Sequence, residues 1–176
     1  MEFEQLVKEH IEPFLKEKGF SLERPYKNSF HFKSDMIQIN IGYNNYERSC
    51  LFGIGMTGEQ EYIFTNKAIK NVFGTEIKLA EVTVEDFVLN VVSFLQNEGS
   101  ELLNKGSNKF KELEEFLHAE SRRYTIKMMQ DQYLPLADNA WKNGEYQEFI
   151  RVIDELKIEE LPDSYKMKYE IANKRK

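Results

Sequence analysis

Residues 29–56 read SFHFKSDMIQINIGYNNYERSCLFGIGM, and this stretch decides the fold because apolar side chains recur in it at every second position. Phe30 and Phe32 flank His31, and isoleucines alternate with polar residues from Ile37 onward. A period of two is typical of strands that bury one face. The predicted strands are residues 29–32, 37–43, 50–56 and 62–64. Short polar connections between them predict an antiparallel meander.

Apolar residues at helical spacing predict helices before and after these strands in the sequence. The predicted helices are residues 3–18, 67–73, 84–95, 110–135, 146–156 and 162–172. Thr83 and Asp86 form a capping pattern at the start of the third helix. Pro13 is expected to bend or divide the first helix, and Pro135 is expected to end or kink the long one. Alternating charge over residues 76–82 predicts an edge strand.

The order of these elements predicts an α+β fold in one domain. A chain of 176 residues lies within the usual size of one domain and can bury a sizeable core. We expect an N-terminal helix with an antiparallel sheet of about four to five strands over residues 1–82, and a helical C-terminal half over residues 83–176. The last two predicted helices form a helical hairpin.

The composition is that of a chain that folds in water. Hydrophobic residues make up 41% and charged residues 31%, which is too apolar for disorder and too polar for a membrane protein. Cys50 is the only cysteine, so neither an intrachain disulfide nor a cysteine-rich zinc site can form. The first residues lack the pattern of a secretory signal. We therefore expect a cytoplasmic protein.

The charge distribution favours a basic partner over a nucleic acid. The net charge is −6, and the first hundred residues carry 10 basic and 15 acidic side chains. Nucleic-acid binding depends on basic side chains that neutralise phosphates, so we expect neither a nucleic-acid nor a membrane partner. The basic residues near the end of the chain are Lys166, Lys168, Lys174, Arg175 and Lys176. We interpret them as cations that complement the negative end of the last helix.

The pattern G-x-G-x-x-G occurs at Gly53, Gly55 and Gly58, with Glu76 at about the distance of a ribose-binding acid. A dinucleotide site needs these glycines between a strand and the start of a helix. Here the first two glycines lie inside the predicted strand. We interpret them as sites of close backbone packing in the sheet rather than as a nucleotide site.

Two further groups of residues suggest chemistry that we do not favour. Cys50 and His31 both lie in the sheet region and would suit a nucleophile and its base, but Cys50 alternates like a buried apolar residue. Glu114, Glu115 and His118 share one helix face, but a di-iron site requires a second such motif that the chain lacks. We expect no catalytic residues, no metal site and no cofactor.

The connection between the second and third predicted strands is the candidate binding site. Its residues are Tyr43, Asn44, Asn45, Tyr46, Glu47 and Arg48. Loops that a rigid sheet holds in place commonly carry recognition, and tyrosines with amides and opposite charges suit contact with a protein. An ordinary polar hairpin connection has the same composition, so both interpretations stay open.

The N-terminal half resembles a known family. The resembling residues are Ile11, Glu12, Pro13, Phe14, Leu15, Lys16, Lys18, Gly19 and Phe20, followed by the strands at 30–32 and 37–43. Over roughly residues 1–65 the chain resembles a bacterial domain family of unknown function, members of which occur among immunity proteins of polymorphic toxin systems. The resemblance involves fold-forming residues and transfers no catalytic position.

The resemblance implies a specific form of protein binding. Immunity proteins occlude a toxin, and an acidic surface with exposed aromatic side chains complements a basic partner. We expect a non-enzymatic protein-binding module, in its most specific form an immunity protein that neutralises a basic toxin. The alternative is a small-molecule or nucleotide-handling enzyme that uses the sheet face.

Overall fold

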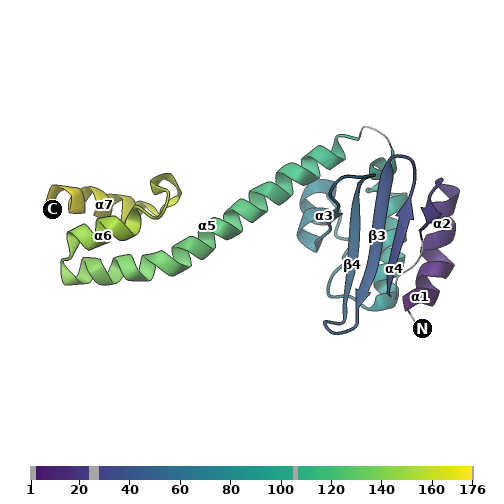
Figure 1. Ribbon diagram of the computed structural model, residues 1–176, viewed down its shortest axis with the longest axis horizontal. Helices are drawn as coiled ribbons and strands as arrows, with labels where there is room; N and C mark the ends of the chain where they lie inside the picture. Colours follow the sequence, from purple (N-terminus) through teal and green to yellow (C-terminus); the bar gives the residue numbers. More distant parts are fainter. Residues whose placement is uncertain (1–2, 24–27, 105–106, 176) are drawn as a thin grey trace. The chain divides into compact units, whose positions relative to one another are not determined.

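A computed structural model describes residues 3–23, 28–104 and 107–175 (Figure 1). A helical segment comes first, a five-stranded antiparallel sheet follows, and the C-terminal half is helical. The predicted α+β fold is therefore confirmed. Among the described residues, no helix has the length and apolar character needed to cross a membrane.

The sheet is a meander in which each strand pairs with the next one in the sequence. Its strands are β1 (Ser21–Leu22), β2 (Ser29–Lys33), β3 (Ile37–Asn44), β4 (Ser49–Met56) and β5 (Tyr62–Ile63). The strand β1 was not predicted, because two residues are too few for a period to be recognised. In the central pair, Ile39 lies opposite Ile54 and Ile41 lies opposite Phe52. All four of these side chains are buried, so the predicted alternation is confirmed.

The helices agree with the sequence pattern at most of their ends. They are α1 (Phe3–Leu6), α2 (Glu12–Glu17), α3 (Asn66–Phe73), α4 (Val84–Gln96), α5 (Lys109–Asn143), α6 (Tyr146–Ile153) and α7 (Asp163–Arg175). The α4 helix begins as predicted, since the Thr83 hydroxyl accepts a hydrogen bond from the backbone N–H of Asp86 at 3.1 Å. The α3 helix ends at Gly74, whose φ of 69° lies in the left-handed region that glycine tolerates.

The first helical segment, which Pro13 was expected to bend or divide, changes its helix type just before this residue and stays helical throughout. A π-helical turn, Val7–Ile11, separates α1 from α2, and Pro13 stands at the start of α2. Proline has no backbone N–H to donate, and the turn before it is π-helical, with the N–H of Glu12 bonded to the carbonyl of Val7 five residues earlier.

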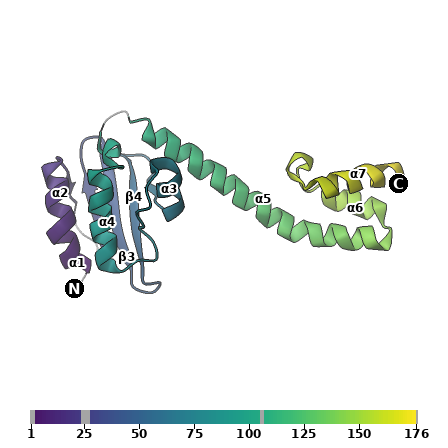
Figure 2. The same ribbon diagram turned by 180° about the vertical axis from the view of Figure 1, so that it is seen from behind.

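The helices α1, α2 and α4 cover one face of the sheet (Figures 1 and 2). The core between these layers contains fully buried aromatic rings from β2, β4 and α4, among them Phe30, Phe52 and Phe94. Phe52 and Phe94 pack edge to face with ring centroids 6.2 Å apart. The opposite face carries Ser29, His31 and the other polar residues of the alternation.

The described residues form two compact units, each with its own hydrophobic core. The sheet unit is Met1–Leu117, and the helical unit is His118–Lys176. The first core extends from Phe3 to Leu113, and the second from Ala137 to Ala172. The division falls inside α5, so α4 belongs with the sheet unit. The single domain stays a prediction.

The predicted edge strand over residues 76–82 is wrong. This segment is irregular, and the side chain of Asn66 binds its backbone. The Asn66 Oδ1 accepts hydrogen bonds from the N–H groups of Leu79 at 2.8 Å and Ala80 at 2.9 Å. The Asn66 Nδ2 donates to the carbonyl of Ala80 at 3.0 Å. The amide of Asn66 therefore supplies the backbone hydrogen bonds that a neighbouring strand would otherwise supply.

Pro135 was predicted to end or kink the long helix; the predicted end is wrong, because α5 continues through this residue to Asn143, and the kink stays a prediction. Proline cannot donate a backbone hydrogen bond to the carbonyl four residues earlier. The helix continues because burial of Ala137 and Ala140, after the proline, anchors its last turns in the second core. The helical hairpin of α6 and α7 is confirmed.

Candidate functional site

The predicted binding residues lie at the tip of the β3–β4 hairpin. The Oδ1 of Asn44 accepts hydrogen bonds from the backbone N–H groups of Tyr46 at 2.9 Å and Glu47 at 3.3 Å. These bonds fix the turn, and Arg48 closes it with a left-handed φ of 50°. The ring of Tyr46 is 100% exposed. A defined backbone thus presents a wholly exposed aromatic side chain.

The six candidate residues do not share one surface. Tyr43 is half-buried, and its ring packs on Phe3 with centroids 5.6 Å apart. The other five residues, Asn44 to Arg48, are exposed. The tip surface, which we define as residues 44–48, therefore excludes the Tyr43 ring, which supports the hairpin from the core side.

The polar face of the sheet carries a small hydrogen-bonded cluster. The Ser29 hydroxyl lies 3.1 Å from the Nε2 of His31 and 3.1 Å from the Oδ1 of Asn40. All three side chains are half-buried. A hydroxyl has one proton, so it donates to Asn40 and accepts from a protonated Nε2 of His31. In this arrangement His31 does not act as the base for Ser29.

The glycine run lies in β4 and the turn that follows it, not at the start of a helix. A Cβ atom at Gly55 would lie 2.7 Å from the carbonyl oxygen of Gln60, because the chain folds back over the strand there. Gly58 has a φ of 86° and forms the turn. The interpretation of close backbone packing is confirmed at Gly55. A dinucleotide fingerprint requires a helix directly after the glycines, and here the strand β5 follows them.

Cys50 and His31 lie on opposite faces of the sheet. Cys50 alternates with Phe52 toward the core, whereas His31 alternates with Phe30 and Phe32 toward the other face. Burial raises the pKa of the Cys50 thiol to about 11, so the nucleophilic thiolate is a minor form at neutral pH. These two residues cannot work as a nucleophile and base.

Glu114, Glu115 and His118 lie on α5, as predicted. Among the described residues, no group of three or more histidine, cysteine, aspartate or glutamate side chains is arranged to hold a metal ion. Three of the cations near the end of the chain, Lys166, Lys168 and Arg175, have partners within the helical unit. Lys168 pairs with Asp138 at 2.8 Å, and Arg175 donates to the hydroxyl of Tyr146 at 2.8 Å. Lys176 lies outside the described residues.

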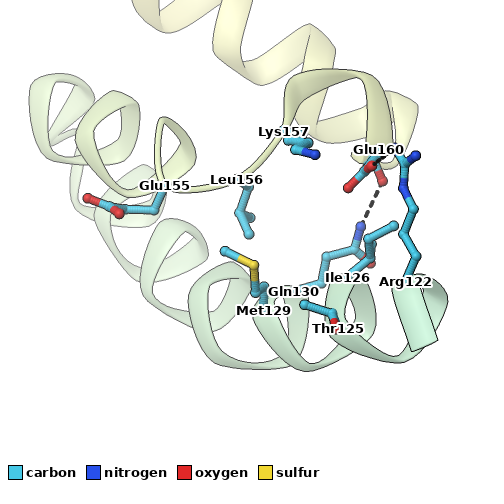
Figure 3. A pocket seen from close by; sticks show the side chains of 9 residues that line it. All are labelled: Arg122, Thr125, Ile126, Met129, Gln130, Glu155, Leu156, Lys157 and Glu160. Atoms are coloured by element: carbon cyan, nitrogen blue, oxygen red, sulfur yellow. Dashed lines mark hydrogen bonds and ion pairs between the residues drawn. The ribbon is translucent and has the colours of Figure 1, made fainter. Parts of the chain in front are cut away.

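The helical unit contains a hollow of about 190 Å³ that the sequence did not indicate (Figure 3). Its walls are α5 and the segment after α6, which includes a short 3₁₀ turn, Ile158–Glu160. The lining residues are Arg122, Thr125, Ile126, Met129, Gln130, Glu155, Leu156, Lys157 and Glu160. Residues about thirty positions apart in the sequence meet here, and helical periodicity alone cannot predict such a meeting.

The two units differ in charge. The sheet unit carries 19 acidic and 13 basic side chains, whereas the helical unit carries 11 of each. The sheet unit therefore holds the whole net charge of −6. Comparison with protein-family models, with curated proteins and with solved structures found no match to this chain.

Proposed function

We propose that this chain is a non-enzymatic protein-binding module that contacts its partner through the tip surface, residues 44–48. The observation that carries the proposal is Tyr46, which is 100% exposed on a backbone that Asn44 fixes with two hydrogen bonds. Because the backbone of this turn is already ordered, binding costs little backbone entropy. Tyrosine is also enriched among the residues that dominate interface energies.

The charge of the sheet unit supports a basic partner. An excess of acidic side chains attracts a basic surface, speeds association and makes binding depend on salt. In its most specific form, the module is an immunity protein that occludes a basic toxin. This form rests on the acidic sheet unit together with the resemblance over roughly residues 1–65.

The test measures the affinity of the full-length chain for a basic polypeptide encoded beside it. Tyr46→Ala should weaken binding by about 1–3 kcal/mol without changing the thermal transition, because the ring supports none of the core. Tyr124→Ala is the matched control, since this tyrosine is 67% exposed in the helical unit. Calorimetric titration at low and high salt measures both effects.

Two results would contradict the proposal. Wild-type affinity in the Tyr46→Ala variant would remove the tip surface as the binding site. An affinity that does not fall as salt rises would remove the argument for a basic partner, since screening weakens attraction between opposite charges.

The second candidate function is an enzyme that uses the polar face of the sheet, and the cluster of Ser29, His31 and Asn40 favours it. A hydroxyl, an imidazole and an amide within hydrogen-bond distance are groups that hold polar ligands. A rise in melting temperature with nucleotides or small metabolites that Asn40→Ala abolishes would favour this candidate.

A further inference from the structure

The hollow in the helical unit has an apolar interior. Ile126 and Met129 line it from α5, and Leu156 lines it from the opposite wall (Figure 3). Its volume of about 190 Å³ is somewhat larger than a 150 Å³ apolar protein cavity that accepts benzene. The interior therefore has room for one apolar group of six or seven carbon atoms.

Specific bonds hold the two walls of the hollow in place. The Nε2 of Gln130 donates to the backbone carbonyl of Glu160 at 2.7 Å. The guanidinium of Arg122 pairs with the carboxylate of Glu160 at 2.6 Å. Both bonds join α5 to the 3₁₀ turn, so the hollow is formed in advance and needs no rearrangement to accept a ligand.

The charges around the mouth of the hollow leave a cation available. Arg122 already neutralises Glu160, and the carboxylate of Glu155 points away from the hollow in Figure 3. Lys157 stands over the hollow, is exposed, and forms no ion pair with the part of the chain that the structure describes. An ammonium group beside an apolar interior matches a ligand whose apolar part ends in an anion.

The rim also favours a small acid over a peptide. The side-chain donors Arg122 and Gln130 already bind Glu160, and the hydroxyl of Thr125 donates to the carbonyl of Ser121 at 3.0 Å. A peptide would bring backbone amide groups to this rim, where these donors are already engaged. A free carboxylate requires only Lys157.

We propose that the hollow is a binding site for a small monocarboxylate that carries one apolar group of about the size of a phenyl ring. The apolar group lies against Ile126, Met129 and Leu156, and the carboxylate pairs with Lys157. This site does not depend on the protein-binding role of the sheet unit, because all of its residues belong to the helical unit.

Phenylacetate is the probe, and the methionine methyl groups report where it binds. The chain has six methionines, and Met129 is the one that lines the hollow. In the full-length protein with ¹³C-labelled methionine methyls, phenylacetate should saturably shift the Met129 signal, with a dissociation constant of about 1 mM or below. The signal of Met128, which precedes it, should stay in place.

Neutral phenylacetamide should bind about fivefold more weakly, because it lacks the charge that pairs with the ammonium group. Lys157→Met should weaken phenylacetate binding by the same factor while keeping the aliphatic stem. Lys127→Met is the matched control. Lys127 is exposed on α5, the helix that carries Met129, but it does not line the hollow. Ile126→Trp, which leaves the Met129 reporter in place, should fill the hollow and abolish the shift of the Met129 signal. Equal melting temperatures of the lysine variants confirm that the fold is intact.

Three results would overturn the proposal. The first is a Met129 signal that does not move at phenylacetate concentrations tenfold above the expected dissociation constant. The second is equal affinity for phenylacetate and phenylacetamide, or for the wild type and Lys157→Met. The third is clearly tighter binding of a short peptide with a C-terminal phenylalanine, which would assign the hollow to a polypeptide terminus instead of a free acid.

Discussion

Gly55 is the position in β4 with the least room for a side chain. The turn after β4 folds back over this residue, and Gln38 of β3 fastens it there. The Nε2 of Gln38 donates to the carbonyl of Glu59 at 3.0 Å, and the Oε1 accepts from the N–H of Gly58 at 3.4 Å. The backbone of Gln60 therefore cannot give way easily to a Cβ atom at Gly55.

Gly55→Ala should destabilise the fold by about 1–3 kcal/mol, because the added carbon would lie 2.7 Å from the carbonyl oxygen of Gln60. Gly42 is the matched control in the neighbouring strand, where an added Cβ would meet its nearest atom at an ordinary 3.8 Å. Gly42→Ala should change stability by about 0.5 kcal/mol or less. Urea denaturation measures both variants, and an equal effect of the two would contradict a steric role for Gly55.

At the scale of the element, two asparagine side chains bind the backbone of the segment after α3, and Asn66 makes most of these bonds. Asn66 makes three hydrogen bonds to the backbone of Leu79 and Ala80. The Leu79 side chain is buried in the first core, so these bonds fix an irregular segment over apolar packing. Asn90 adds a further bond, from its Nδ2 to the carbonyl of Lys78 at 2.9 Å.

Asn66→Ala should cost about 2 kcal/mol, because two backbone donors and one acceptor would lose their partner together. Asn71→Ala is the control, since Asn71 also lies on α3 but makes a single exposed bond to the carbonyl of Lys67. That variant should stay within about 0.5 kcal/mol of the wild type. Hydrogen exchange at Leu79 and Ala80 provides the local measurement, and unchanged protection in Asn66→Ala would show that packing alone holds the segment.

Elements with a regular period could be predicted from the sequence, and those held by single side chains could not. The strands β2, β3 and β4 show a period of two, and α4 shows both a helical period and a capping residue. Residues 76–82 alternate like a strand, but the amide of Asn66, outside that window, decides their conformation. Pro135 was expected to end or kink its helix. The helix continues because Ala137 and Ala140, which follow the proline in the sequence, pack in the second core.

The two candidate binding surfaces also differ in whether a local sequence pattern could locate them. The tip surface could be located because a hairpin connection follows from two adjacent strands. The core-side placement of Tyr43 follows from the same period of two that buries Ile39 and Ile41, whereas its ring contact with Phe3 of α1 could not be predicted from a local pattern. The hollow depends on Arg122 and Gln130 reaching Glu160, and no local pattern encodes those bonds.

At the scale of the whole molecule, the chain has two cores that differ in kind. The sheet unit buries strands under helices, whereas the helical unit buries Phe149 and its neighbours among three helices. Asp138 of α5 joins α7 by accepting bonds from Lys168 at 2.8 Å and Tyr165 at 2.7 Å. These bonds lower the pKa of Asp138. They stabilise the helical unit above the unfolded-state pKa and are lost as pH falls through the lowered value.

The two cores predict that the units unfold separately. Phe149 is fully buried, and its ring packs on Trp141 with centroids 5.2 Å apart. Phe149→Asp would place an unpaired charge in that core and should cost more than about 3 kcal/mol, enough to unfold the helical unit. Met167→Asp is the control, because Met167 is 63% exposed on α7. Hydrogen exchange should show lost protection in α6 and α7 of Phe149→Asp, with native protection of β3 and β4. Loss of protection in both units would instead show that the chain unfolds as one cooperative domain, as the length of the sequence suggests.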